Sequence, residues 1–404
     1  MRILVQKFGG TSVKSKASRQ HAISHIKDAL ADDYKVVAVV SAMGRYPDPY
    51  ATDSLLSLIN GNQSKISNRE KDLLLACGET ISATVFSHDL LEHQIDSVAI
   101  SGGEAGIITT NNFSNAQIKT IDTQHIYHLL TKHQVVIVAG FQGKTENNEV
   151  TTIGRGGSDT SATALAAALQ AEFVDIFTDV NGIMTADPRV VSNAKKLEAI
   201  SYTEICNLAY QGAKVIHPRA VEIAMQANIP IRVRSTILKD KGTLITNIPE
   251  TDYSERIHDK LVTGIAYVNH ITQIRIQEVK KPQQLHVLVF KAMAEAGISV
   301  DFINISPNGV VYTIFERDET LAKKVLNDLK VNPTYTEDCA KISLVGAGMS
   351  GLPGVTSKIV QTLTNKQIPI LQSADSHRTI WVLIQNKNLE TALNALHVAF
   401  QLEK

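Results

Sequence analysis

A lysine and two glycines directly follow the first apolar run of the chain, where they could bind an anion. The opening segment, MRILVQKFGGTSV, places Lys7 ahead of Gly9, Gly10 and Thr11. Glycine lets backbone N–H groups turn toward an anion and approach it closely. The segment therefore predicts a phosphate site. It is not a P-loop, because that motif places its lysine after the glycines. Without further support, Lys7 could equally be a solvated charge at a strand end.

A second glycine-rich segment, GRGGSDTSATALAAAL, leads into an alanine-rich helical pattern. The N-terminus of such a helix offers free N–H groups and a positive dipole end, which suit a phosphate or a carboxylate. An arginine here can grip a carboxylate through two parallel hydrogen bonds. The alternative is a capped helix whose arginine pairs with a surface acid. The residues concerned are Gly154, Arg155, Gly156, Gly157, Ser158 and Asp159.

Short apolar runs alternate with helical patterns up to residue 235, and these elements must position the two segments. Runs rich in Val and Ile predict strands at 35–43, 134–141, 172–180 and 229–235. Between them, residues 160–171 place Ala162, Leu165, Ala166 and Leu169 on one helical face. Strands that alternate with helices predict an α/β sandwich with a mainly parallel sheet.

The pattern changes after residue 235. Residues 236–262 are polar, charged and interrupted by Gly and Pro, which predicts a linker. Two similar units follow at 263–335 and 340–404, and each has the strand-helix-strand-strand-helix order of a ferredoxin-like βαββαβ module. The sequence thus predicts a catalytic domain at 1–235 and a regulatory pair of modules.

Composition narrows the class of protein. Of 404 residues, 44% are hydrophobic, and 40 Lys and Arg balance 40 Asp and Glu, so no net charge favours nucleic acid or an anionic membrane. Cys77, Cys206 and Cys339 lack the spacing of a disulfide framework or a zinc site. No apolar run approaches the roughly 20 residues of a membrane helix. We expect a cytoplasmic protein with no metal-ligand cluster of its own.

Three segments in order, KFGGTSV, GRGGSDTSA and FTDVNGIMTADPRVV, resemble the motifs of aspartate kinases in the amino acid kinase superfamily. The two C-terminal units resemble the paired ACT domains of that family. The resemblance implies an amino acid kinase-type αβα sandwich followed by two ferredoxin-like ACT domains. It also implies transfer of the γ-phosphoryl group of ATP, with Mg²⁺, to the side-chain carboxylate of L-aspartate, the first step toward lysine, threonine and methionine.

The resemblance assigns roles by position. Lys7 and Asp159 are implied to be catalytic, with Asp159 orienting Lys7 or the phosphates. Arg155 is implied to hold the α-carboxylate of aspartate and Glu79 its α-amino group, although a helix N-terminal glutamate is the ordinary reading of Glu79. The full set implied to bind substrate is Ser41, Thr52, Glu79, Arg155, Gly156, Gly157 and Ser158, and an insert, RYPDPYA, separates Ser41 from Thr52.

The nucleotide is implied to lie against a strand end and the segments that follow it. His217 is interpreted as structural, since phosphorylation of a carboxylate gives it no clear role. The residues implied to contact ATP are Lys7, Gly9, Gly10, Thr11, Thr178, Asp179, Asp187, Arg189 and Lys214.

The regulatory pair is implied to bind an end-product amino acid and to join chains in a homo-oligomer. GISVDFINIS makes Ser299, Val300, Asp301 and Asn304 the candidate effector contacts. Gln283 replaces the glycine of the usual loop, which puts those contacts in doubt. The match to the short, monofunctional, diaminopimelate-sensitive type favours meso-diaminopimelate as effector, with lysine next.

Other classes remain alternatives. Gly346, Gly348 and Gly351 spell G-x-G-x-x-G after a strand, as in an NAD-dependent oxidoreductase or a kinase–homoserine dehydrogenase fusion, but only 53 residues follow. Glutamate, acetylglutamate, carbamate and uridylate kinases are rivals within the superfamily. A catalytically inactive ACT sensor would show damaged phosphate motifs, whereas Lys7, Arg155 and Asp159 are present.

Overall fold

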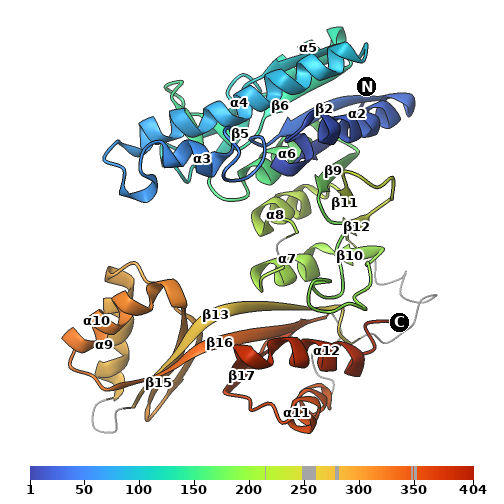
Figure 1. Cartoon of the computed structure of the whole chain (residues 1–404). Helices are drawn as coiled ribbons and strands as arrows, with labels where there is room; N and C mark the ends of the chain where they lie inside the picture. The colour runs from blue at the N-terminus through green and yellow to red at the C-terminus, as the bar shows by residue number, and fades with distance from the viewer. Residues whose placement is uncertain (214, 248–260, 278–281, 347–348, 350–352) are drawn as a thin grey trace. The chain divides into compact units, whose positions relative to one another are not determined.

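The computed structural model describes residues 1–213, 215–247, 261–277, 282–346, 349 and 353–404, which form two compact units (Figure 1). The first unit comprises 1–183, 196–209 and the described residues of 214–257. The second comprises 184–195, 210–213 and the described residues of 258–404. Two short segments from the middle of the chain thus fold with the C-terminal modules.

An eight-stranded sheet forms the centre of the first unit. Its order is β10-β12-β11-β9-β1-β2-β6-β3, and every neighbouring pair except β11–β12 is parallel. This confirms the predicted mainly parallel α/β sheet. The strands are β1 (Arg2–Phe8), β2 (Tyr34–Val40), β3 (Ser97–Ile100), β6 (Val135–Ala139), β9 (Phe173–Thr178), β10 (Ala199–Ser201), β11 (Ile231–Ser235) and β12 (Thr243–Thr246).

Helices cover this sheet because its central strands are apolar on both faces. Leu4 and Phe8 of β1 pack into a core with α2 and α4. Because side chains alternate along a strand, Lys7 points to the opposite face, where α6 packs against β1. The helices are α1 (Gly10–Val13), α2 (Lys16–Ala31), α3 (Thr52–Ser57), α4 (Asn68–Glu92), α5 (Gln124–Lys132), α6 (Gly157–Leu169), α7 (Tyr202–Tyr210), α8 (Pro218–Ala227) and the 3-10 turn η1 (Gly61–Gln63).

A small second sheet is tied to α4 by a buried carboxylate. Its order is β5-β4-β7-β8, from β4 (Ile107–Thr109), β5 (Ile118–Ile121), β7 (Gln142–Lys144) and β8 (Val150–Thr152). Asp72 of α4 is fully buried and accepts hydrogen bonds from N–H and Oγ1 of Thr152 at 2.8 Å each. It also accepts from N–H and Oγ of Ser114 at 2.9 and 3.1 Å. Asp72 therefore fixes the strand that leads into the glycine loop at 154–157.

The domain boundaries drawn from the sequence need two corrections. Residues 236–247 were predicted to begin a linker, but β12 lies there and pairs with β10 and β11 in the main sheet. Residues 184–195 and 210–213 were predicted to belong to the catalytic domain, but they fold with the second unit. A strand as short as β12, or a short segment that leaves one unit and packs with the other, gives no periodic pattern from which its place in the fold could be predicted.

The second unit is built on one antiparallel six-stranded sheet, in the order β14-β15-β13-β16-β18-β17. The strands are β13 (Gly264–Gln277), β14 (Asp301–Ser306), β15 (Gly309–Phe315), β16 (Pro333–Val345), β17 (Gln372–Asp375) and β18 (Thr379–Gln385). The helices are α9 (Pro282–Glu295), α10 (Glu319–Asp328), α11 (Val355–Asn365) and α12 (Leu389–Ala399), with 3-10 turns η3 (Glu316–Asp318) and η4 (Asn386–Asn388).

Two ferredoxin-like modules are present, as predicted, but they share strands. The long neighbouring strands β13 and β16 each run through both modules (Figure 1). The far end of β13 and the start of β16 complete the first module, whose core contains Ile274 and Tyr312. The end of β16 and the start of β13 complete the second, whose core contains Ile342 and Ile359. The boundary predicted at 335–340 therefore falls inside a continuous strand.

The glycine pattern at Gly346 does not belong to a dinucleotide fold. Gly346 directly follows β16 of the antiparallel sheet, and a side chain there would meet the backbone oxygen of Leu261 at 2.2 Å. Gly348 and Gly351 lie outside the described residues. A dinucleotide-binding fold needs parallel strands with crossover helices, so the oxidoreductase alternative loses its structural basis.

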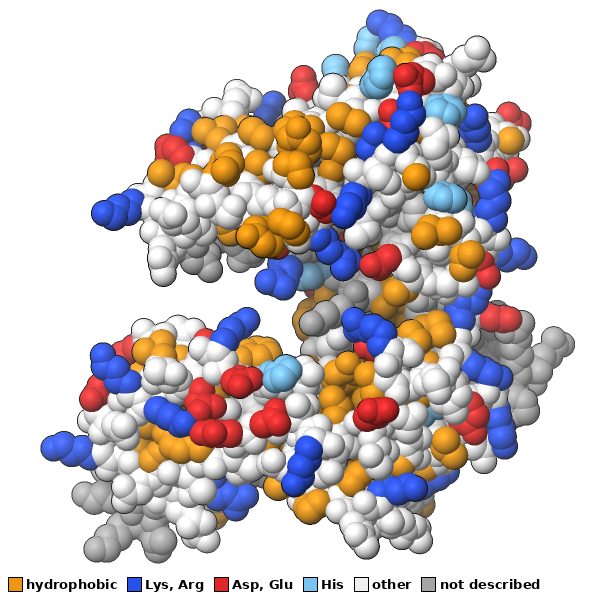
Figure 2. Space-filling view, viewed as in Figure 1, with side chains coloured by type: hydrophobic (Ala, Val, Ile, Leu, Met, Phe, Trp, Pro, Cys, Tyr) orange, Lys and Arg blue, Asp and Glu red, His pale blue; other side chains and the backbone are white. Residues whose placement is uncertain are grey.

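The described part of the chain contains no helix that is both long enough and apolar enough to cross a membrane. On the face shown in Figure 2, Lys and Arg side chains are interspersed with Asp and Glu side chains over both units. This distribution agrees with the balanced charge of the sequence.

Asp72→Ala should destabilise the first unit by about 3 kcal/mol or more, because it leaves buried N–H and O–H donors without an acceptor. Thermal unfolding followed by calorimetry measures the loss. Glu146→Ala is the control, because Glu146 forms an exposed ion pair with Lys119 and should change stability by less than about 1 kcal/mol. Equal melting temperatures for the two variants would contradict the anchoring role of Asp72.

Candidate active site

The first and second glycine-rich segments meet at the carboxyl end of β1. Lys7 lies opposite Val39 of β2 and Ile176 of β9 in the sheet register. Its Nζ lies 2.7 Å from Oδ1 of Asp159, in the first turn of α6, and the two side chains are only 12% and 14% exposed. Asp159 thus contacts Lys7 directly, as a residue that orients the lysine must.

The glycines at 9 and 10 allow two loops to pack together. A side chain at Gly10 would lie 2.6 Å from the backbone oxygen of Ala42, and the N–H of Gly44 donates to the oxygen of Gly10 at 2.9 Å. Gly9 lies beside Nζ of Lys7, 3.5 Å from where a Cβ would be. Thr11 follows, half-buried, in α1. The loop after β1 is therefore held against the loop after β2, next to the lysine.

The loop before α6 adopts backbone angles that favour glycine. Gly154 and Gly156 have φ of +82° and +71°, which side-chain-bearing residues rarely adopt. A Cβ on Gly156 would lie 2.2 Å from the ring of His217. Gly157 and Ser158 are buried at the start of α6. Arg155, between Gly154 and Gly156, is exposed, and its guanidinium forms no hydrogen bond or ion pair with any residue that the structure describes.

Glu79 is a buried carboxylate with one unused oxygen. It lies in the middle of α4, not at its N-terminus, so the ordinary reading of this residue is wrong. Its Oε1 accepts from the N–H of Ala42 at 3.0 Å, its Oε2 has no partner, and the residue is 2% exposed. Burial raises the pKa of Glu79 to about 8, partly offset by the Ala42 N–H. This oxygen is able to accept a hydrogen bond from a ligand, such as one from an ammonium group.

Ser41 and Thr52 lie on the loop that covers Glu79. Ser41 directly follows β2, and its N–H donates to the oxygen of Phe8 at 3.1 Å. Thr52 begins α3, and the preceding loop packs on α4 so closely that a Cβ on Gly78 would lie 3.1 Å from the oxygen of Tyr50. The loop that ends just before Thr52 therefore packs on α4 at the residue next to Glu79.

Thr178 and Asp179 lie at the same sheet edge as Lys7. Thr178 ends β9, its oxygen accepts from the N–H of Thr236 at 3.0 Å, and its hydroxyl donates to Asp179 at 3.1 Å. Asp179 also accepts from the guanidinium of Arg45 at 3.2 Å. The sequence analysis did not single out Arg45, which lies on the loop after β2.

Two further nucleotide candidates fold with the second unit and not with the first. Asp187 and Arg189 belong to the second unit, where Nη2 of Arg189 lies 2.6 Å from Oδ2 of Asp187. Hydrogen bonding to Arg189 lowers the pKa of Asp187. The hydroxyl of Tyr267 in β13 also donates to Asp187, at 3.3 Å. Lys214 lies outside the described residues.

His217 is a structural residue of the site, in keeping with the sequence interpretation. Its Nδ1 accepts from the N–H of Arg219 at 3.3 Å and caps α8. Burial lowers the pKa of His217, so the neutral ring suited to this acceptor role is favoured. Arg219 in turn donates to the oxygens of Ile153 and Ala116 at 3.1 and 3.3 Å. Together His217 and Arg219 pack against the glycine loop and the residue before it.

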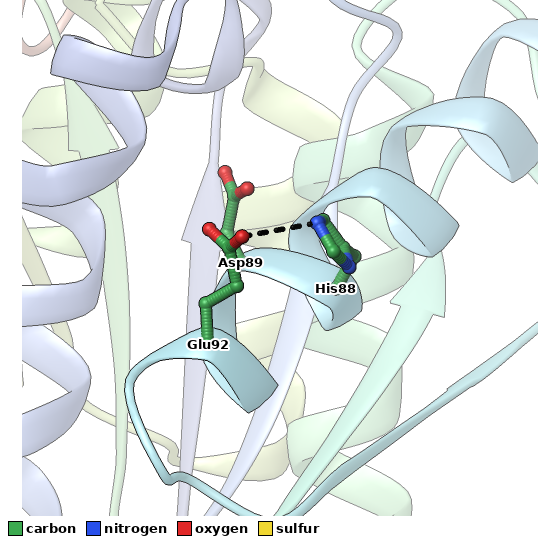
Figure 3. Close-up of side chains that lie close together, drawn as sticks. All are labelled: His88, Asp89 and Glu92. Carbon is green, nitrogen blue, oxygen red and sulfur yellow. Dashed lines mark ion pairs between the residues drawn. The ribbon is translucent and has the colours of Figure 1, made fainter.

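Three side chains near the end of α4 have the composition of a metal site, as Figure 3 shows. Ligand atoms of His88, Asp89 and Glu92 lie within 4.8 Å of one another. Cations already hold the two carboxylates, because Arg19 pairs with Asp89 and Lys16 pairs with Glu92 at 3.2 Å. The cluster is therefore explained as an ion-pair network in which Asp89 is buried and Glu92 and His88 are exposed.

The four candidate effector residues lie together at one edge of the second unit. Ser299 and Val300 precede the edge strand β14, which contains Asp301 and Asn304. Val300 is half-buried against the core of the first module. The carboxylate of Asp301 pairs with Lys341 of β16. Ser299 and Asn304 are exposed.

The family matches, the relatives in sequence and the similar solved structures agree with one another. Residues 2–235 match the amino acid kinase family and residues 334–398 match an ACT domain. Aspartokinase 1 of Bacillus subtilis (strain 168) is 56% identical over 404 residues, 100% of both chains. Two structures of E. coli aspartokinase III each cover 98% of this chain and 99% of that chain. The one in complex with aspartate and ADP (R-state) has a TM-score of 0.78 at 25% identity. The one in complex with lysine and aspartate (T-state) has 0.76 at 26%.

Glu79→Gln should change how stability depends on pH. Since the pKa rises from 4.5 unfolded to about 8 folded, the folded protein keeps a proton that the unfolded chain loses. Stability is therefore fully present below about pH 4.5 and falls until about pH 8, by on the order of 4–5 kcal/mol. The glutamine variant lacks this loss, so its melting temperature relative to wild type should increase from pH 5 to pH 9. Glu146→Gln is the control; a pH-independent difference for Glu79→Gln would contradict the raised pKa.

Proposed function

The chain belongs to the aspartokinases of the amino acid kinase family, kinases that phosphorylate the side-chain carboxylate of aspartate and are regulated through ACT domains, and we propose how its residues divide this work. The observation that carries the proposal is the ion pair of Lys7 with Asp159 at the carboxyl end of β1. It joins the two glycine-rich segments at one point, where a phosphoryl group can be stabilised between a donor and an acceptor.

The acceptor aspartate binds at the carboxyl end of β2, where it meets residues of α4 on one face of the sheet and of the α6 segment on the other. Oε2 of Glu79, buried and without a partner, accepts from its α-ammonium group. Arg155, exposed and unpaired among the described residues, holds its α-carboxylate through a two-pronged hydrogen bond. Ser41, Thr52, Gly156, Gly157 and Ser158 complete this subsite. The side-chain carboxylate is already ionised near neutral pH, so no general base is required.

The nucleotide binds on the side of β9. Gly9, Gly10 and Thr11 donate backbone or hydroxyl hydrogen bonds to its phosphates beside Lys7, and Thr178 and Asp179 line the same edge. Mg²⁺ prefers oxygen ligands, and the half-exposed carboxylate of Asp179 fits an ion carried by the phosphates. When bound, Mg²⁺ neutralises charge on the phosphate oxygens. Asp187, Arg189 and Lys214 contribute further contacts by family resemblance.

The effector is an end-product amino acid, meso-diaminopimelate first and lysine next. The lysine complex of the E. coli relative supports an amino-acid effector. Ser299, Val300, Asp301 and Asn304 form the candidate site, with the Asp301 carboxylate sharing its charge with Lys341. The edge strand β14 also exposes Ile303 and Ile305, at 48% and 57%, which supports chain association into a homo-oligomer through this module.

The proposal includes a place at the start of lysine and diaminopimelate, threonine and methionine biosynthesis, in the cytoplasm. Glutamate and acetylglutamate kinase activities and an inactive ACT sensor are not favoured, because the relatives are aspartokinases along the whole chain and the Lys7–Asp159 pair is intact.

The purified chain should form an acyl phosphate from ATP and L-aspartate, trapped as the hydroxamate, and meso-diaminopimelate should suppress the reaction. Lysine and threonine are tested in parallel, and acetylglutamate and glutamate are the alternative acceptors. Inhibition by lysine alone would overturn the choice of effector. Product with glutamate but not aspartate would overturn the proposed acceptor.

Glu79→Gln and Arg155→Ala should each raise the KM for aspartate by roughly tenfold to a hundredfold, since each removes a hydrogen bond to a charged group worth about 1.5–3 kcal/mol. The KM for ATP should change little. Arg69→Ala, which removes an exposed arginine paired with Glu149, is the matched control for Arg155. Equal increases in both KM values would contradict a role confined to the acceptor.

A further inference from the structure

An exposed ion pair crosses the end of the strand that carries Lys7. Strand β1 lies between β2 and β9 in the sheet. Arg45, on the loop after β2, reaches Asp179, just beyond β9, with Nη2 3.2 Å from Oδ2. The pair therefore joins the acceptor side and the nucleotide side of the site across the carboxyl end of β1.

The backbone at Arg45 is firmly held although its side chain is exposed. The N–H of Arg45 donates to Oδ2 of Asp48 at 3.0 Å, and Asp48 also pairs with Lys14 at 3.0 Å. The preceding residue, Gly44, donates to the oxygen of Gly10 at 2.9 Å. The guanidinium is 73% exposed and the Asp179 carboxylate 52% exposed. Arg45 is thus anchored next to the glycine loop with its charged group turned to solvent.

The charges at this edge favour a further cation during the reaction. The charge of Lys7 is shared with Asp159, and Arg155 is assigned to the acceptor's α-carboxylate. A nucleotide and a carboxylate acceptor are both anionic and must approach each other here. An exposed arginine-carboxylate pair contributes little to stability, so Arg45 can exchange Asp179 for a phosphate at low cost. Its planar fork suits phosphate oxygens.

We propose that Arg45 is a catalytic residue that leaves Asp179 and binds the terminal phosphate of the nucleotide during transfer. The bond between the γ-phosphorus and the bridging oxygen breaks, and its electron pair leaves with ADP. A side-chain carboxylate oxygen of the acceptor forms the new bond to phosphorus. Arg45 stays protonated throughout and stabilises the charge on the transferring group. The proposal rests on the aspartate kinase activity proposed above.

The test compares nucleotides with and without a terminal phosphate, using the full chain. Calorimetric titration with Mg²⁺ and β,γ-imido-ATP should show at least tenfold weaker binding for Arg45→Ala than for wild type. Binding of ADP should stay within twofold. In the hydroxamate assay, kcat should fall by roughly tenfold to a hundredfold, and the KM for aspartate should stay within twofold. Arg45→Lys, which keeps the charge without the fork, should give intermediate values.

Arg2→Ala is the matched control. Arg2 lies at the opposite end of β1 in a similar exposed pair, 3.1 Å from Glu172, and its loss should change neither nucleotide binding nor kcat. Equal loss of ADP and imido-ATP affinity in Arg45→Ala, or unchanged affinities and kcat, would overturn the proposal. If the wild-type chain phosphorylates no aspartate, the proposed activity fails, while the two binding titrations still decide the role of Arg45.

Discussion

The arrangement of the site depends on one buried charge at the end of a buried strand. Lys7 lies on β1, which is apolar on both faces, and only its partner Asp159 and the open sheet edge keep its ammonium group from being an isolated charge in a core. This requirement brings the start of α6 to β1. It also joins the two glycine-rich loops at a single cation.

Close packing of the surrounding loops sets the geometry of that point. Gly10, Gly78 and Gly156 each lie where a Cβ would meet a neighbouring backbone or side chain within about 3 Å, so three segments approach more closely than larger residues would allow. Asp72 and Arg219 then hold the strand that leads into the loop at 154–157 through hydrogen bonds to its backbone. Among these closely packed segments, Oε2 of Glu79 has no hydrogen-bond partner. A buried polar atom without a partner is what we expect of a group that binds a ligand.

The second unit is not simply two consecutive modules, because its modules share strands and an earlier segment of the chain packs on it. Because β13 and β16 each serve both modules, the two modules form one continuous six-stranded sheet. The segment 184–195, which follows the nucleotide-side strand β9 in sequence, packs on the second module. Its Thr185 hydroxyl lies 2.9 Å from the buried ring of His397, and Asp187 accepts from Tyr267 of β13. Asp187 and Arg189, to which the family resemblance gave a nucleotide role, therefore fold with the second unit.

The sequence by itself determined the fold class, the pair of ferredoxin-like modules and the two glycine-rich segments, because periodic apolar patterns and glycine-rich turns are local properties. It also carried a family resemblance that the relatives support. Only the tertiary structure decided that β12 completes the main sheet, that residues 184–195 leave the first unit, that Glu79 is buried with a free oxygen and that Arg45 faces Asp179. These features depend on contacts between residues far apart in sequence, and burial and pairing of a polar side chain are properties of those contacts, not of the residue or its neighbours in the chain.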